Sequence, residues 1–536
     1  MHVTGNDFER GHRVRTDICI VGGGAAGLTI ARNLIASGLD VVLLESGDVV
    51  ASEATTDLGR GDNVGLPYFD FSETHFRELG GATAHWDGWI RPLDAIDFEK
   101  RSWVPLSGWP FKRELLDGYY RRAQSDIDVK DFRYLPDDWT DQIPELYPQT
   151  VANDRRLTLA VWRKANPPTR FAAKFLPELD AADNITLITR ANVTNIVLNA
   201  AKSDVDHLEV RTLEGTNFTV AAQVMVLAAG GLETPRIMLE AGVGGPNVGR
   251  YWMEHPHVPS GRLILDRDSG RRVGSSAIDH GLLGALKRLE LERPKGGNKF
   301  AFTLTPEAQE ELAVGNVSLH LRGISGEPPR VATRLAAGLR EPIHTLRRMP
   351  KEGEYSMRNQ FRGFLGEIPD VLRVGTERLL KRPDALEIFA QAEQVPNRDS
   401  CITLSDQTDE LGMPRMVLNW SLTDFDKHSI RTTLDVLDDA VKVAGIGEVV
   451  PYPEFEDRNN VKWSDRLTGG HHHLGATRMG TDPSVSVVDG DCRVHGLANM
   501  YVCGPSTFPT GGFANPLLTT VAMATRLADH LKLRRP

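Results

Sequence analysis

Three consecutive histidines, His471, His472 and His473, are the residues of this chain best suited to acid–base chemistry. Imidazole accepts a proton near neutral pH, so one of the three is a candidate general base. Adjacent side chains of an extended strand point to opposite faces, so three neighbours do not converge on one metal ion. We therefore expect a proton acceptor here and no metal site.

A second candidate group follows closer to the C-terminus, in a loop that ends at Asn515 and Pro516. Asn515 can cap the next helix and Pro516 suits a first helical position, which predicts a helix from here to about Leu531. The positive N-terminus of such a helix stabilises negative charge nearby. An Asn-Pro pair alone is more often just a cap, so its meaning depends on the rest of the chain.

The N-terminal region predicts a dinucleotide-binding unit. An apolar run over residues 16–21 is typical of a buried parallel strand. Gly22, Gly24 and Gly27 follow it with the spacing G-x-G-x-x-G. These glycines allow a tight turn, the close approach of a pyrophosphate, and close packing of helix on strand.

The unit continues with a helix over about residues 25–36 and a second strand over residues 40–44. Glu45 ends that strand, where an acid can bind ribose hydroxyls. The pattern fits FAD and NAD equally well. The glycine-rich stretch 242–249 has the wrong spacing for a second fingerprint and follows a helical stretch, so we expect one dinucleotide.

The composition is that of a globular protein with more than one core. The chain has 536 residues, of which 40% are hydrophobic and 25% charged, and this length favours two domains. The formal net charge of −10 argues against a nucleic-acid partner. We find no apolar run long enough to cross a bilayer, no signal peptide and no disulfide framework, and we expect a cytoplasmic protein. The oligomeric state stays open.

Between the two ends, strand and helix patterns alternate. A second glycine-rich loop covers residues 80–88, and a helix is expected near residues 112–126. Further strands are expected over residues 185–189, 192–199, 207–213, 218–229, 385–404 and 416–420, and further helices over residues 234–240 and 424–444. The stretch 326–385 is rich in arginine, and a solvated helical face, a lid or an oligomer contact would each explain it.

Taken together, these motifs resemble the glucose–methanol–choline (GMC) family of FAD-dependent alcohol oxidases and dehydrogenases. The residues that carry the resemblance are the fingerprint with Glu45, the loop beginning Gly80-Gly81, residues 228–231, His472 to Gly480, and Gly504 to Pro516. They follow the order of the family and cover most of the chain except residues 260–390.

The resemblance implies FAD as cofactor and roles for single residues. His472 corresponds to the family's catalytic base, three positions before Gly475, and Asn515 to its partner before a proline. Val193 matches the place where backbone groups meet the adenine. The implied FAD-binding residues are Gly22, Gly24, Ala25, Ala26, Gly27, Glu45, Gly80, Gly81, Thr83, His85, Trp86, Val193, Ala229, Gly230, Gly504, Asn515, Pro516 and Leu517.

The loop Gly80 to Trp86 is similar to that of pyranose oxidases and bacterial sugar dehydrogenases. In some relatives a histidine at the place of His85 carries the flavin covalently, whereas others bind FAD without a covalent bond. The resemblance also implies a sugar or glycoside secondary alcohol as substrate, oxidised to a ketone, with oxygen, a quinone or another acceptor taking the electrons. Gln394 or Arg91 would then bind substrate hydroxyls.

Two other functions stay open at this point. One is a dehydrogenase or oxidase of a non-sugar alcohol in natural-product tailoring. The other is a relative that keeps FAD without redox turnover, which the presence of both His472 and Asn515 argues against.

The expected fold class is α/β (α+β overall). A discontinuous Rossmann-like FAD-binding domain would comprise residues 1–100, 180–260 and 455–536. A substrate-binding domain, built on a mostly antiparallel sheet with helices, would comprise residues 101–179 and 261–454.

Overall fold

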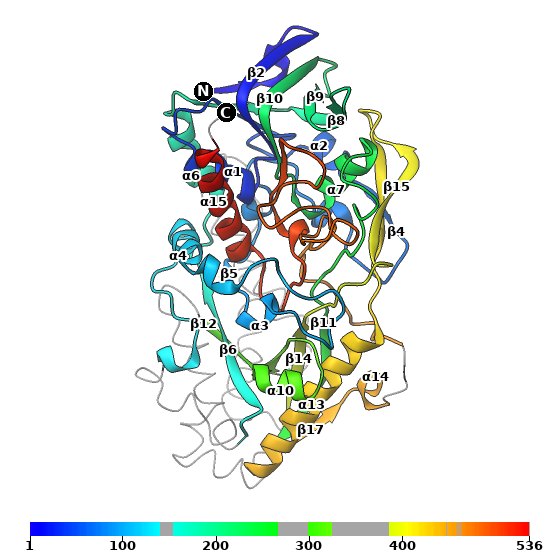
Figure 1. Cartoon of the computed structure of the whole chain (residues 1–536). Helices are drawn as coiled ribbons and strands as arrows, with labels where there is room; N and C mark the ends of the chain where they lie inside the picture. The colour runs from blue at the N-terminus through cyan, green and yellow to red at the C-terminus, as the bar shows by residue number, and fades with distance from the viewer. Residues whose placement is uncertain are drawn as a thin grey trace, which may run out of the picture.

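The computed structural model describes residues 1–139, 154–265, 298–323, 385–445, 447–457, 460 and 462–534. Within these residues the strands form two large sheets and one small sheet, and helices flank them (Figure 1).

The first sheet has a parallel centre. Its strand order is β1 (His2–Thr4), β7 (Ile185–Thr189), β3 (Val41–Leu44), β2 (His12–Val21), β10 (Asn217–Leu227), β9 (Val205–Arg211) and β8 (Asn192–Leu198), with β18 (Met500–Val502) also pairing with β10. All pairs from β1 to β10 are parallel, as is the pair of β18 with β10. Strands β9 and β8 add an antiparallel edge.

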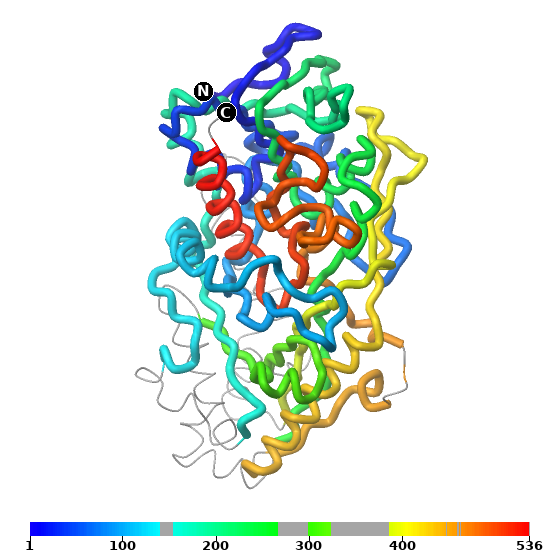
Figure 2. Tube along the Cα trace, in the orientation of Figure 1, coloured from blue at the N-terminus to red at the C-terminus, as the bar shows by residue number. Residues whose placement is uncertain are grey.

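Helices from distant parts of the chain cover this sheet. Helix α1 (Ala25–Asn33) packs against the C-terminal helix α15 (Leu517–Leu533) and against α6 (Phe171–Asp180), and α15 also packs against α4 (Asp117–Asp126). Helix α7 (Gly230–Glu240) follows β10 directly. Figure 2 shows α15 in red beside the blue N-terminal segment, so the two ends of the chain share one layer.

The second sheet is antiparallel throughout. Its order is β17 (Gly447–Pro451), β11 (His257–Leu265), β14 (Ala385–Ala392), β13 (Val317–Gly323), β12 (Asn298–Leu304), β6 (Leu157–Lys164) and β5 (Trp89–Ile90). The long helix α13 (Asp424–Val443) packs against four of these strands and shares their apolar core.

The remaining elements are short. A small sheet has the order β15 (Cys401–Thr408), β16 (Pro414–Asn419) and β4 (Gly61–Asn63). The short helices are α2 (Glu53–Asp57), α3 (Ala95–Phe98), α10 (Pro306–Glu311) and α14 (Pro453–Glu456). No helix among the described residues is long and apolar enough to cross a lipid bilayer.

The expected fold class is confirmed, with shifts at several element boundaries. Helix α1 ends at Asn33 instead of residue 36, and α7 begins at Gly230 instead of residue 234. Strands β11, β12 and β13 were not predicted, although the alternation of apolar and polar residues in β12 and β13 is a strand signal. Apart from its last residue, the stretch 326–385 lies outside the described residues.

Each of the two large sheets is built from segments that are far apart in the sequence. The first sheet uses residues 2–44, 185–227 and 500–502, and the second uses residues from 89 to 451. One departure is β5, which lies within the segment expected for the FAD-binding domain but pairs with β6 of the second sheet. The exact division into two domains stays a prediction.

The first testable prediction concerns Gly27. A Cβ at this position would lie 1.9 Å from the carbonyl oxygen of Gly22, so alanine forces α1 away from β2. We expect Gly27→Ala to lower the free energy of unfolding by about 1–3 kcal/mol, measured by chemical denaturation. Gly118→Ala is the control, because a Cβ there meets nothing within 4 Å in helix α4. Equal stability of the two variants would contradict the prediction.

Candidate functional site

The carboxyl edge of the parallel sheet is open where three neighbouring strands end. Gly24 follows β2, Gly230 follows β10, and Gly504 follows β18. A Cβ added at any of these three glycines would meet no described residue within 4 Å. Ligands of open α/β sheets bind at this edge, and the three positions leave the backbone free for a close approach.

The fingerprint loop is held by its neighbours. Gly22 has φ of +106°, and its Cβ would lie 2.6 Å from the Ala228 carbonyl oxygen, so only glycine fits. The N–H of Gly80 donates to the Gly23 carbonyl at 2.8 Å. The Glu45 carboxylate accepts from the N–H of Gly23 at 2.7 Å. The predicted ribose-binding residue therefore lies directly against the fingerprint loop.

The other predicted residues of this region lie around the same loops. Thr83 donates through its hydroxyl to the Gly80 carbonyl at 2.6 Å, and the Trp86 indole donates to the Thr169 carbonyl at 2.9 Å. His85 is half-exposed; its ring stacks on Phe76 and its Nε2 contacts the Glu78 carboxylate. A covalent flavin bond through that nitrogen would replace the contact with Glu78.

The structure brings the two candidate catalytic side chains together. His472 Nε2 lies 3.1 Å from Asn515 Nδ2, and the His472 ring is almost fully buried. A Cβ on Gly231 would lie 2.1 Å from the carbonyl oxygen of His473, so the histidine segment packs on the start of α7. The pair thus lies next to the open edge of the parallel sheet.

The N-cap expected at Asn515 is wrong. Pro516 is the N-cap, and α15 begins at Leu517. The Asn515 carboxamide does not bond to the helix, because its Oδ1 accepts from the Trp162 indole N–H at 3.1 Å and its Nδ2 faces His472. Asn515 joins two side chains instead of capping α15.

These contacts fix where the protons lie. The Trp162 indole only donates, so Asn515 presents Oδ1 to it and donates through Nδ2 to His472 Nε2. The proton of neutral His472 then lies on Nδ1 and is donated to His255 Nδ1 at 2.8 Å. Burial holds the pKa of His472 well below its usual value and lowers that of His255 to about 4. The available lone pair of His472 is therefore on Nε2.

A buried carboxyl group supports this pair from the backbone side. Glu254 accepts from the Tyr68 hydroxyl at 2.6 Å, from the His255 N–H at 2.7 Å and from the His472 N–H at 2.9 Å. Burial raises the pKa of Glu254 to about 7, although these donors act to lower it. Its Oε1 lies 3.9 Å from His472 Nδ1. Once Glu254 is ionised, its carboxylate can therefore stabilise a positive charge on His472.

The three neighbouring histidines have separate environments. His471 stacks on Phe69, His472 faces Asn515, and His473 bonds through Nε2 to the Tyr68 hydroxyl at 3.0 Å. Among the described residues, Glu254, His255 and His472 place ligand atoms within 4.8 Å of one another and are suited to a metal by spacing. The hydrogen bond between the two Nδ1 atoms occupies this group, and the absence of a metal stays a prediction.

Four residues at the site were not predicted from the sequence: Tyr68, Trp162, Glu254 and His255. The run from Glu254 to His257 contains two histidines and an acid, which was an available signal. Tyr68 and Trp162 carry no local signal, because only the fold brings them to the site.

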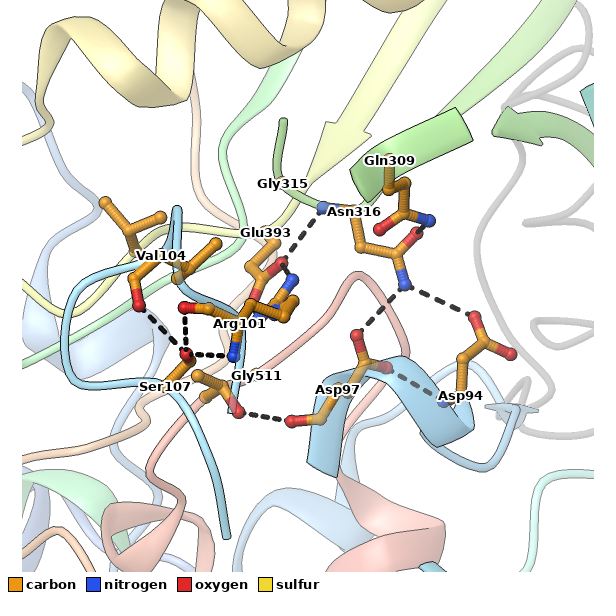
Figure 3. A network of polar contacts seen from close by, with 12 residues as sticks. Asp94, Asp97, Arg101, Val104, Ser107, Gln309, Gly315, Asn316, Glu393 and Gly511 are labelled. Atoms are coloured by element: carbon orange, nitrogen blue, oxygen red, sulfur yellow. Dashed lines mark hydrogen bonds and ion pairs between the residues drawn. The ribbon is translucent and has the colours of Figure 1, made fainter. Parts of the chain in front are cut away.

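A polar network supports the loop that carries Asn515 (Figure 3). Asn316 donates through its side chain to Asp97 at 3.0 Å and through its backbone N–H to Glu393 at 2.9 Å. Glu393 forms a buried ion pair with Arg101. The Thr510 hydroxyl donates to the Asp97 carbonyl at 2.6 Å, which ties the network to the loop.

The two predicted hydroxyl-binding residues have other partners. Gln394 accepts from the Glu254 N–H and the Trp420 indole, both at 3.0 Å, and donates to the Ser421 carbonyl at 3.0 Å. This geometry does not favour a substrate role for Gln394, because its carboxamide is used within the protein. Arg91 bonds to the Val161 carbonyl and Asp94, with its guanidinium over the Trp162 and Phe513 rings.

Comparison with known proteins agrees with this geometry. Residues 17–261 match the FAD dependent oxidoreductase family model, and residues 396–524 match the GMC oxidoreductase model. The chain is 24% identical to 2-methyl-1,2-propanediol dehydrogenase of Mycolicibacterium austroafricanum, over 97% of this chain and 96% of that protein. It is also 24% identical to pyranose 2-oxidase of Tricholoma matsutake, over 84% and 72%. A formate oxidase variant from Aspergillus oryzae RIB40 has the same fold, with a TM-score of 0.54, 15% identity and coverage of 97% and 99%.

Gly512 offers a test of the loop that carries Asn515. It has φ of +51°, and a Cβ would lie 2.3 Å from Asp97 Oδ2. We expect Gly512→Ala to cost about 1–3 kcal/mol in the free energy of unfolding and to slow substrate-dependent flavin bleaching, because the loop must shift. Gly496→Ala is the matched control, since its φ is +81° with open space around the Cβ. The prediction fails if both variants retain full activity.

The ionisation of Glu254 should make the rate of flavin bleaching depend on pH near neutrality. Its pKa of about 7 means that the carboxyl becomes negative as the pH rises through this value, 3.9 Å from His472 Nδ1. Proton transfer to His472 should become faster over this range, because an adjacent carboxylate stabilises the imidazolium. The rate of substrate-dependent flavin bleaching should therefore rise through about pH 7. Glu254→Gln should remove the rise, and an identical profile in this variant would count against the assignment.

Proposed function

The chain belongs to the glucose–methanol–choline family of FAD-dependent oxidoreductases, and from this premise we propose that it oxidises a secondary hydroxyl group of a sugar or glycoside to a ketone. The observation that carries the proposal is the 3.1 Å contact between His472 Nε2 and Asn515 Nδ2 at the open edge of the parallel sheet. A base and a hydrogen-bond donor at this spacing can hold one hydroxyl oxygen between them.

FAD is the cofactor, and the residues at the sheet edge fit it. The open backbone at Gly24, Gly230 and Gly504 leaves room for a nucleotide along the ends of three strands. When bound, FAD accepts the hydride from the carbon that carries the hydroxyl group. Helix α15 begins at Leu517, directly after the catalytic loop, and its N-terminus favours negative charge on a ligand at that end.

The protein residues have the following tasks in this proposal. The substrate oxygen replaces the direct contact between His472 and Asn515, so that it accepts from Asn515 Nδ2 and donates its proton to His472 Nε2. His472 starts neutral, because burial keeps its pKa low. As His472 gains the proton, its Nδ1–H remains bonded to neutral His255, and Glu254 offsets the new positive charge. The carbon becomes a carbonyl as hydride and proton leave.

A non-sugar alcohol is the second candidate substrate, because the diol dehydrogenase relative matches the chain over nearly its full length. A separate choice concerns the electron acceptor, which is oxygen, a quinone or another molecule. A dye-linked assay with and without oxygen separates an oxidase from a dehydrogenase.

The decisive experiment is anaerobic mixing of the purified FAD-loaded protein with a panel of sugars, glycosides and simple diols. Bleaching of the flavin by sugars would support the proposal, bleaching by diols alone would favour the second candidate, and no bleaching at all would favour an FAD-binding protein without turnover. We expect His472→Ala to keep FAD but to slow bleaching by roughly 10²–10⁴-fold.

His471→Ala is the matched control for this variant. Its ring stacks on Phe69 and makes no hydrogen bond to the catalytic pair, so bleaching should stay near the wild-type rate. An unimpaired rate in His472→Ala, or an equal loss in both variants, would remove His472 from the role of base.

A further inference from the structure

The second sheet has two faces of opposite character. Val161, Phe300, Leu319 and Ile388 belong to the apolar core that the sheet shares with α13. The alternate residues form the other face. Strand register pairs Trp162 with Lys299, His320 with Phe389, and Ser318 with Gln391 across this face. Residues paired across antiparallel strands lie on the same side, so this face, here called the polar face, carries Lys299, Ser318, His320 and Gln391 beside an apolar cluster around Trp162.

The polar face contacts the loop that carries Phe513 and Asn515. Trp162 donates to Asn515, and Gln391 Nε2 donates to the Phe513 carbonyl at 2.6 Å. The ring of His257, on the neighbouring strand β11, lies 6.2 Å from the ring of His472. A substrate held by His472 and Asn515 therefore lies next to this face of the sheet.

Two cations on the polar face, Lys299 and Arg322, form no ion pair with another described residue. Lys299 Nζ lies 5.2 Å from the centroid of the Trp162 ring, and Arg322 Cζ lies 3.4 Å from the centroid of the Phe389 ring. The carboxylate that attracts Arg322 belongs to Glu387, which is already paired with Arg466 at 2.7 Å.

The surroundings of Lys299 disfavour its charged form, as its pKa shows. Burial, and then the charge of Arg322, lower the pKa of half-buried Lys299 to about 8. A cation that is partly removed from water without an anion is unfavourable, and a bound anion would offset this for Lys299, whereas Arg322 is exposed and available to the same anion.

A buried imidazole beside the two cations also has a free nitrogen. His320 is 3% exposed, its ring centroid lies 5.1 Å from that of Trp162, and its Nδ1 has no hydrogen-bond partner in the described part of the chain. The other nitrogen, Nε2, lies 3.3 Å from the Ser318 hydroxyl. The Ser318 hydroxyl donates its proton to the Gln391 carbonyl at 3.0 Å, so it accepts from His320 Nε2, and Nδ1 of the neutral ring carries a lone pair. His320 Nδ1 can therefore accept one hydrogen bond from a substrate hydroxyl, whereas buried polar atoms are ordinarily paired.

We propose that Lys299 and Arg322 bind an anionic group of the substrate and that His320 accepts a hydrogen bond from one of its hydroxyl groups, so that the alcohol oxidised at His472 belongs to an acidic sugar or glycoside. The proposal rests on the oxidation of a sugar or glycoside proposed above and narrows its substrate class. A carboxylate and a phosphate share the required chemistry, since both accept hydrogen bonds from lysine and arginine.

The first experiment compares a neutral methyl glucoside with the methyl glucuronide and the 6-phosphate of the same sugar, by anaerobic flavin bleaching. We expect at least one anionic sugar to react with a kcat/KM about 10- to 100-fold above the neutral one. Lys299→Met should remove this advantage and leave the neutral sugar unaffected, and Lys299→Arg should keep much of it. The exposed Lys462 provides the control Lys462→Met, with no expected change.

The second experiment measures binding without turnover. Cyclohexanecarboxylate and its neutral analogue cyclohexanecarboxamide have no hydroxyl to oxidise, and calorimetric titration of the FAD-loaded protein gives their affinities. We expect the carboxylate to bind more tightly than the amide, and Lys299→Met to weaken only the carboxylate by about 10-fold or more.

The two experiments distinguish failure of this inference from failure of the proposed function. Bleaching by neutral sugars, with no preference for anions and no selective carboxylate binding, overturns the anion site and leaves sugar oxidation standing. Selective carboxylate binding that depends on Lys299, without bleaching by any sugar, supports the anion site and overturns sugar oxidation. A loss in Lys299→Met that is equal for neutral and anionic sugars also overturns the anion site.

Discussion

The hydrogen bond between His472 and Asn515 requires elements from the whole chain to meet. Asn515 lies in the loop before α15, His472 packs on the start of α7, and Trp162 reaches the pair from β6 of the second sheet. Because the indole of Trp162 can only donate, it fixes the orientation of the Asn515 carboxamide and so the tautomer of His472. The second sheet therefore orients the candidate catalytic pair.

Burial governs the electrostatics of the site. His255, His257, His472 and His473 all have pKa values lowered chiefly by loss of solvent, so they stand as neutral hydrogen-bonding groups at neutral pH. Glu254 shifts in the opposite direction for the same reason, since burial disfavours the charged form of either kind of group. The result is a base that is ready to accept a proton beside a carboxyl that can balance the charge.

Much of the nucleotide-binding half could be predicted from the sequence, because its signals are local. The spacing of Gly22, Gly24 and Gly27 after an apolar strand reflects contacts within one short unit, such as the clash that a Cβ on Gly27 would make with Gly22. The pairing of His472 with Asn515 came from resemblance to a family, and the structure places the two side chains in contact.

The rest of the site depends on long-range contacts that leave no local pattern. Trp162 and Tyr68 reach the catalytic pair only because distant strands and loops come together. The helix-cap interpretation of Asn515 failed for the same reason: a local rule was overridden by a side chain 353 positions away. The family resemblance implied that Gln394 or Arg91 binds substrate hydroxyls, but the Gln394 carboxamide accepts hydrogen bonds from the backbone of Glu254 and the indole of Trp420.

The position of β18 has a consequence for how the molecule is made. This strand, at residues 500–502, completes the parallel sheet beside β10, and α15 then covers α1. Strands β2 and β9 pair with β10 from nearby or earlier parts of the chain, but residues 225–227 of β10 stay without their β18 neighbour until residues 500–502 are translated. Such an unpaired stretch is a template for wrong pairing, so the nascent chain carries this risk of aggregation while residues 228–499 are being made.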